Sequence, residues 1–210
     1  MLRLIVFDCD GVMFDSRAAN IAYYNAILQH FGCSPMSPEE EDYVHMHSVN
    51  LCMQHIFRNR PDITTQEIDS VRKSLTYDPF LRYMTMEPDL REFLDLTFQK
   101  YHLAISTNRT NTMVPLLKQY DLVDYFGIVM TAATAPRPKP APDGLLEILN
   151  HYDCQANEAL FIGDSILDEQ HATACGVPLI AFRSPELKAA YHVQNFMQIL
   201  TLPPLQDTIA

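Results

Sequence analysis

A short apolar run that leads directly into two aspartates is the feature that most constrains the fold of this chain. Leu4–Phe7 contains no polar residue, which is typical of a strand buried on both faces of a parallel sheet. Asp8 and Asp10 follow where this strand ends, and Gly11 permits a sharp turn after them. Open α/β sheets bind ligands at the carboxyl ends of their strands. The two carboxylates are therefore candidates for a site at that edge.

The same pattern recurs far downstream. Ala159–Gly163 is a second apolar run, and Asp164 and Asp168 follow it. If both strands are central, four carboxylates converge. Two carboxylates about 4 Å apart repel each other by about 4 kcal/mol at an effective dielectric of roughly 20. Such a cluster needs a cation, a shared proton or both. Because oxygen ligands favour a hard cation, Mg²⁺ is the natural candidate.

From residue 88 onward, helical and strand patterns alternate along the chain. Strands are predicted at residues 103–106, 128–130, 160–163 and 178–182, and helices at about 89–98, 112–120, 144–149 and after 164, ending at 176. Alternation of this kind predicts βαβ units and a parallel sheet.

Residues 16–84 carry only helical and loop patterns. Two capping boxes, at residues 37–40 and 64–67, mark helix starts within this block. The simplest account is one α/β core, formed by residues 1–15 and 85–210, with a helical cap of residues 16–84 inserted after the first strand. We therefore predict an α/β fold with a Rossmann-like parallel sheet and an inserted α-helical cap domain.

Composition limits the partners of the chain. The 210 residues carry a net charge of −11, which argues against nucleic acid or an anionic membrane as the main partner. No apolar run approaches the roughly 20 residues of a membrane span. Five cysteines without a C-x-x-C pair predict reduced thiols rather than a zinc site or a disulfide framework. We expect a cytoplasmic protein, a monomer or homodimer, that acts on a small molecule.

Two further polar features follow predicted strands. Thr107 and Asn108 come directly after the strand at 103–106, where a hydroxyl can donate a hydrogen bond to an anion. Taken alone, these two residues are more often a helix cap. Lys139 lies among three prolines that rigidify the backbone and carry the lysine to a fixed place. A solvent-exposed loop lysine is the alternative, but a stiff loop after the strand at 128–130 favours the carboxyl edge.

Together, these side chains indicate a phosphoryl-transfer site. One carboxylate can attack phosphorus and form an aspartyl phosphate. A second carboxylate can protonate the leaving oxygen and then activate water. The cation, the lysine and the hydroxyl can neutralise charge on the phosphoryl oxygens.

In this order, the motifs resemble those of the haloacid dehalogenase superfamily, in its branch of phosphoglycolate-phosphatase-like and β-phosphoglucomutase-like hydrolases with a helical cap. The resemblance implies that Asp8 is the nucleophile and Asp10 the general acid and base. It implies that Thr107 binds phosphate, and Asn108 lies beside it as a candidate substrate contact. It also implies that Lys139 binds phosphate and steadies the nucleophile. In this family an acid at the place of Asp10 is associated with phosphate esters.

The resemblance also implies a metal site. Asp8 and Asp164 would bind Mg²⁺ directly, and the backbone carbonyl of Asp10 would be a further ligand. Asp168 would either bind the metal directly or support it from the second coordination shell.

The cap is where the family selects its substrate. The candidates there are His47, Arg58 and Arg72, because the arginines could meet a second anionic group of the substrate. The alternative is that these side chains are solvated surface groups, which most such charges are.

We therefore predict a Mg²⁺-dependent phosphatase that hydrolyses a small phosphorylated metabolite through an aspartyl-phosphate intermediate. A phosphomutase of the β-phosphoglucomutase type would use the same residues. A phospho-aspartate signalling protein is an alternative of another class, which the long helical insertion and Asp10 disfavour.

Overall fold

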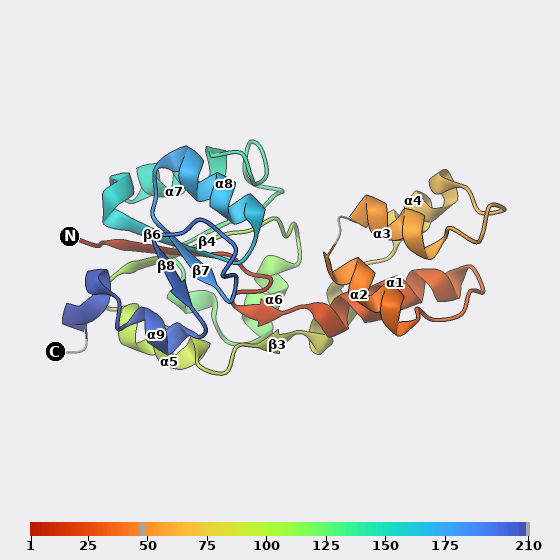
Figure 1. Cartoon of the computed structure of the whole chain (residues 1–210), viewed down its shortest axis with the longest axis horizontal. Coiled ribbons are helices and arrows are strands. Elements are labelled where there is room, and N and C mark those ends of the chain that lie inside the picture. The colour runs from red at the N-terminus through yellow and green to blue at the C-terminus, as the bar shows by residue number, and fades with distance from the viewer. Residues whose placement is uncertain (47–48, 209–210) are drawn as a thin grey trace. The chain divides into compact units, whose positions relative to one another are not determined.

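The computed structural model describes residues 1–46 and 49–208 of the chain (Figure 1). It consists of two compact units. The larger unit holds Met1–Asp15 and Met86–Ala210, and the smaller unit holds Ser16–Thr85. The smaller unit is therefore an insertion, because the chain leaves the larger unit after Asp15 and re-enters it at Met86.

A six-stranded parallel sheet forms the centre of the larger unit. Its order is β5-β4-β1-β6-β7-β8. The strands are β1 (Leu4–Phe7), β4 (His102–Ser106), β5 (Ile128–Met130), β6 (Ala159–Gly163), β7 (Leu179–Phe182) and β8 (Tyr191–Val193). The register pairs Phe7 of β1 with Ile105 of β4 and with Ile162 of β6. The residues that follow these three strands therefore meet at one edge of the sheet.

Helices cover both faces of this sheet, with α7 and α8 on one face and α5 and α9 on the other (Figure 1). Leu4 and Val6 of β1 pack into the cluster that includes residues of α7 and α8. The Phe7 ring lies against Phe93 of α5 and Phe196 of α9. Because side chains alternate along a strand, β1 must be apolar throughout to bury both faces. The helices of this unit are α5 (Leu90–Thr97), α6 (Met113–Gln119), α7 (Asp143–His151), α8 (Ile166–Cys175) and α9 (Phe196–Ile199).

The predicted fold class is confirmed, with one addition to the sheet. The edge strand β8 was not predicted, because Tyr191 is only half-buried and His192 is exposed, so the segment lacks an apolar run. Two strands of two residues each, β2 (Phe14–Asp15) and β3 (Thr85–Met86), form a separate sheet. Neither was predicted, because two residues are too few to carry a pattern.

The smaller unit is helical. Both predicted capping boxes form: the Ser37 N–H donates to the Glu40 carboxylate over 3.0 Å, and Thr64 caps α4 together with Glu67. The helices bury one apolar cluster that includes Tyr24, Ile27, Met53, Phe57 and Ile68. The helices are α1 (Arg17–His30), α2 (Pro38–Met46), α3 (Val49–Ile56) and α4 (Thr65–Ser74), followed by the 3₁₀ turn Asp78–Tyr83. Throughout residues 1–46 and 49–208, the helices are too short or too polar to cross a membrane.

Candidate active site

The end of β1 places Asp8 and Asp10 at the carboxyl edge of the sheet. The backbone N–H of Asp8 donates to the carbonyl of Ile162 over 2.8 Å, which fixes Asp8 beside the end of β6. Gly11 turns the chain with a φ of 76°. A Cβ atom at Gly11 would lie 1.9 Å from Oδ2 of Asp164, so only glycine lets the two segments approach this closely. The first and last acidic pairs therefore meet.

The start of α8 holds Asp168 in one orientation. Ser165 is the N-cap of this helix, and its Oγ donates to Oδ2 of Asp168 over 2.6 Å. The backbone N–H groups of Asp164 and Ser165 donate to the same oxygen. A Cβ atom at Gly163 would lie 2.4 Å from Cβ of Asp168, so the glycine makes room for this buried side chain. The Oδ2 atom of Asp168 is thus fully engaged in hydrogen bonds to the turn that begins α8.

Lys139 bridges the two acidic motifs. Its Nζ lies 2.6 Å from Oδ1 of Asp8 and 2.6 Å from Oδ1 of Asp168, and all three side chains are nearly buried. Asn108 fixes the backbone of Lys139, because its Oδ1 accepts from the Lys139 N–H over 2.9 Å and its Nδ2 donates to the Lys139 carbonyl. The structure therefore places the Asn108 amide on the lysine loop. Its predicted contact with substrate stays a prediction.

Thr107 begins the segment after β4, and this segment brings an arginine that the sequence analysis missed. The buried Thr107 accepts a hydrogen bond from the Arg109 N–H at its Oγ1. The Arg109 guanidinium then reaches Oδ1 of Asp10 over 2.7 Å and donates to Thr112 over 3.1 Å. The Arg109 side chain is only 8% exposed. The sequence offered one signal for this role: an arginine only two residues after Thr107, in a chain with a net negative charge.

These residues surround one pocket of about 230 Å³. It lies entirely within the larger unit. Its lining includes five of the predicted site residues and three others: Asp8, Asp10, Thr107, Asn108, Arg109, Lys139, Ser165 and Leu167. The predicted hydroxyl, lysine and first acidic pair are therefore brought together.

The buried carboxylates have raised pKa values. Burial raises the pKa of Asp8 to about 7, although Lys139 acts to lower it and Asp168 to raise it. Burial, and then the charges of Asp8 and Asp168, raise the pKa of Asp164 to about 8. Burial acts to lower the pKa of Lys139, but the two carboxylates outweigh it and raise that pKa above its ordinary value. Carboxyl groups with pKa values near neutral are groups that a bound cation would stabilise in the ionised form.

The donor set suits a divalent cation. Asp8, Asp164 and Asp168 each offer an oxygen, and these oxygens lie within 4.8 Å of one another. An all-oxygen set fits a hard cation. Asp168 already accepts hydrogen bonds at both oxygens, which leaves Asp8 and Asp164 as the better placed direct ligands. The Asp10 side chain pairs with Arg109, and the ligand role of the Asp10 backbone carbonyl stays a prediction.

The predicted cap residues lie in the smaller unit. His47 falls outside the described residues. Arg58 pairs with Glu40 over 2.5 Å, and Arg72 pairs with Asp69 over 3.2 Å. Each arginine therefore has a carboxylate partner within its own unit, and contact with a substrate stays a prediction.

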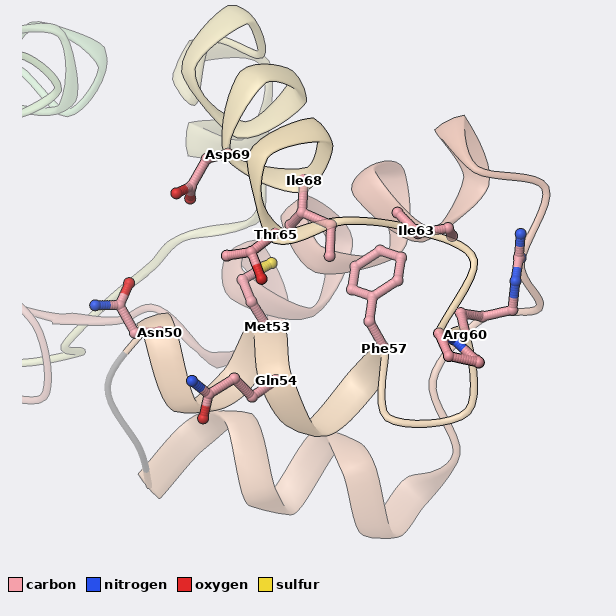
Figure 2. A pocket seen from close by; sticks show the side chains of 10 residues that line it. Asn50, Met53, Gln54, Phe57, Arg60, Ile63, Thr65, Ile68 and Asp69 are labelled. Atoms are coloured by element: carbon pink, nitrogen blue, oxygen red, sulfur yellow. The ribbon is translucent and has the colours of Figure 1, made fainter.

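The smaller unit also has a larger hollow of about 410 Å³, lined by residues of α3, α4 and the segment between them (Figure 2). Phe57, Ile63 and Ile68 supply apolar walls, while Asn50 and Gln54 of α3 supply amide groups. The lining of this hollow includes none of the predicted site residues.

Comparison with known proteins shows which family this chain belongs to. A family model described as haloacid dehalogenase-like hydrolase matches residues 5–182. A phosphoglycolate phosphatase of Nitrosospira multiformis is 27% identical over 187 residues, covering 83% of this chain and 80% of that protein. One from Chromobacterium violaceum is 29% identical over 192 residues, covering 86% and 84%.

A solved structure supports the same relationship. The crystal structure of a HAD-superfamily hydrolase of subfamily IA, variant 1, from Geobacter sulfurreducens aligns with a TM-score of 0.87. The two sequences are 35% identical, and the alignment covers 95% of each chain. The resemblance inferred from the motifs is thereby confirmed. This chain is a phosphatase-type enzyme of the haloacid dehalogenase-like hydrolase family.

Proposed function

We propose that this enzyme is a Mg²⁺-dependent phosphatase that hydrolyses a small phosphate monoester through an aspartyl phosphate on Asp8. The observation that carries the proposal is the position of Lys139, whose Nζ lies 2.6 Å from both Asp8 and Asp168 in the pocket that also holds Asp10 and Thr107. An ammonium group at this distance favours the ionised form of the Asp8 carboxylate and orients it.

In the first half of the reaction, a carboxylate oxygen of Asp8 attacks phosphorus, and the bond from phosphorus to the ester oxygen breaks. The Asp10 carboxyl gives its proton to the leaving oxygen, so the alcohol leaves as a neutral molecule. Asp10 is suited to this exchange with solvent and substrate because its side chain is 38% exposed, whereas that of Asp8 is 10% exposed.

In the second half, a water molecule attacks the phosphorus of the aspartyl phosphate. Asp10, now a carboxylate, takes the proton of this water. The bond from phosphorus to the Asp8 oxygen breaks, which restores the carboxylate and releases inorganic phosphate. The balance is one ester and one water consumed, and one alcohol and one phosphate formed.

The surrounding side chains handle the charge of the phosphoryl group. Lys139 supplies a fixed positive charge at the nucleophile, and Thr107 lines the same pocket. Asp8 and Asp164 would hold Mg²⁺, with Asp168 keeping Lys139 and the Ser165 turn in place. When bound, the cation would neutralise the carboxylates and the incoming phosphate.

Relatives give a first compound to test. Several of them are described as phosphoglycolate phosphatases, so 2-phosphoglycolate heads the substrate panel. We further propose that the inserted unit, Ser16–Thr85, acts as the substrate-selecting cap. Lids of this kind exclude water and complete a site when substrate binds.

The experiment is a phosphate-release assay with MgCl₂ across 2-phosphoglycolate, sugar phosphates and p-nitrophenyl phosphate. We expect release from at least one metabolite, and an Asp8→Asn variant that folds normally but does not turn over, because an amide is a poor nucleophile toward phosphorus. A folded Asp8→Asn variant with substantial activity would rule out the covalent mechanism. Isomerisation of a sugar phosphate without phosphate release would instead identify a phosphomutase.

A further inference from the structure

A buried histidine behind the active site has two specific hydrogen-bond partners. His171 lies on α8, one turn after Asp168, and is 1% exposed. Its Nδ1 lies 2.7 Å from the carbonyl oxygen of Ala141, and its Nε2 lies 3.0 Å from Oγ of Ser106. A carbonyl oxygen can only accept, so Nδ1 carries the proton. The neutral ring therefore accepts at Nε2 from the Ser106 hydroxyl.

The neutral state follows from the surroundings of the ring. Burial is the largest influence, and it lowers the pKa of His171 to about 4. The Phe161 ring packs edge-on against the imidazole, which keeps that side apolar. At neutral pH, His171 is thus a donor at one nitrogen and an acceptor at the other, and both are satisfied.

The two hydrogen bonds join three segments that carry the site. Ser106 is the last residue of β4 and directly precedes Thr107. Ala141 is two residues after Lys139, on the loop that Asn108 holds from the other side. The third segment is α8 itself, whose Asp168 contacts Lys139. These segments are distant in sequence, 65 residues for the bond to Ser106 and 30 for the bond to Ala141.

Filling space is a poor explanation for a histidine at this position. An apolar side chain of similar size would fill the same volume without two polar atoms that lose their hydration on burial. A buried imidazole is favourable only where both nitrogens find partners with good geometry. Here both partners are parts of the site-bearing segments, which points to positioning.

We propose that His171 is a positioning residue that fixes Lys139 and Thr107 relative to Asp168, through its hydrogen bonds to Ala141 and Ser106; this inference rests on the phosphatase function proposed above. His171 contacts neither phosphate nor nucleophile in this scheme. It acts by holding the lysine loop and the end of β4 against α8. A shift of about 1 Å in such a group can lower a turnover rate by roughly 10²-fold.

The test compares four variants in the full-length protein: His171→Leu, His171→Asn, Ser106→Ala and the control Thr97→Val. Leu removes both hydrogen bonds. Asn keeps a donor near the place of Nδ1, and so keeps the bond to Ala141. Thr97 is a fully buried hydroxyl that donates to Phe93 within α5, so its loss removes a buried hydrogen bond away from the site. The readouts are kcat and KM for p-nitrophenyl phosphate with MgCl₂, and the thermal midpoint.

We expect His171→Leu to lower kcat by roughly 10- to 100-fold, with a smaller change in KM. His171→Asn should recover most of that loss, and Ser106→Ala should lose about threefold. Thr97→Val should lower the thermal midpoint while kcat stays at the wild-type value. A folded His171→Leu protein with wild-type kcat would overturn the positioning role, as would an equal loss of kcat in Thr97→Val.

Two other outcomes are also decisive. If His171→Leu does not fold, Ser106→Ala decides, and an unchanged kcat in that variant overturns the proposal. If the wild-type protein hydrolyses no phosphate ester, the proposed function fails and this inference fails with it. An active wild type with insensitive variants removes the positioning role alone.

Discussion

The Nζ atom of Lys139 lies 2.6 Å from a carboxylate oxygen of Asp8, and both side chains are almost completely buried. The same ammonium group contacts Asp168 at 2.6 Å. One cation therefore serves two buried carboxylates, one directly after β1 and the other in the first turn of α8. Removing it leaves two buried carboxyl groups without their cationic partner, in surroundings that solvate charge poorly.

Lys139→Met is therefore expected to lower the free energy of unfolding by about 3–5 kcal/mol, the usual cost of breaking a buried ion pair from one side. Urea unfolding at neutral pH without metal measures it. The control is Arg137→Met, which removes a cation from the same loop as Lys139. It breaks a partly exposed pair with Asp143 at the start of α7 and should leave the unfolding midpoint unchanged. Equal midpoints for the two variants would contradict the prediction.

Asp10→Asn should slow turnover by roughly 10²–10⁴-fold, the range for a positioned general acid and base. The loss should be smaller for an aryl phosphate than for an alkyl phosphate, because a good leaving group needs less protonation. Steady-state rates on both ester types measure this.

Arg109 provides a matched test of the same group, since its guanidinium binds Asp10 over 2.7 Å. Arg109→Leu should show the same preference for aryl esters with a smaller overall loss. Equal losses on alkyl and aryl phosphates in both variants would mean that Asp10 holds structure rather than transferring a proton.

The raised pKa values of Asp8 and Asp164 predict how stability depends on pH in the metal-free protein. Both groups hold protons in the folded state up to about pH 7 and 8, whereas in the unfolded chain they release them near their ordinary value of 3.8. Because the folded state binds more protons, stability is lost as pH rises through the folded pKa values. His171, whose pKa is lowered from 6.5 to about 4, makes stability increase with pH, but only below about pH 6.5.

The thermal midpoint in EDTA should therefore fall between about pH 6.5 and 8.5. Saturating MgCl₂ should flatten this slope, because a bound cation stabilises the ionised carboxylates. Asp164→Asn should also flatten it, while Asp143→Asn, which changes a partly exposed carboxyl outside the acidic cluster, should keep it. A midpoint that rises over this range in EDTA would show that the acidic cluster is not protonated near neutral pH.

The two cap arginines should affect substrate choice more than chemistry. Their ion pairs with Glu40 and Asp69 are partly exposed, and such pairs contribute little, so each guanidinium can exchange its partner for an anionic group of a substrate. Arg58→Gln and Arg72→Gln should change the rate on 2-phosphoglycolate relative to p-nitrophenyl phosphate. Arg82→Gln, which removes a cation stacked on Tyr83, is the control. Unchanged ratios in both test variants would place selection elsewhere.

Features that depend on a few neighbouring residues were predictable from the sequence. The apolar run of β1 must be buried on both faces, which places Asp8 at the carboxyl edge of a parallel sheet. The capping boxes that begin at Ser37 and Thr64 form within four residues, so local hydrogen bonding decides them. The order of the motifs predicted the family, because residue types and their spacing are properties of the sequence and do not depend on how the chain folds.

The tertiary structure alone decided which polar group faces which. The Asp10 carboxylate pairs with Arg109, which is 99 residues away in the sequence. The Asn108 side-chain amide makes two hydrogen bonds to the backbone of Lys139. His171 meets Ser106 and Ala141 only because the packed core brings α8 within hydrogen-bond distance of the end of β4 and of the lysine loop. Periodicity predicts which face of an element is buried, but hydrogen-bond partners depend on the distance between segments, and that distance is set by how the whole core packs.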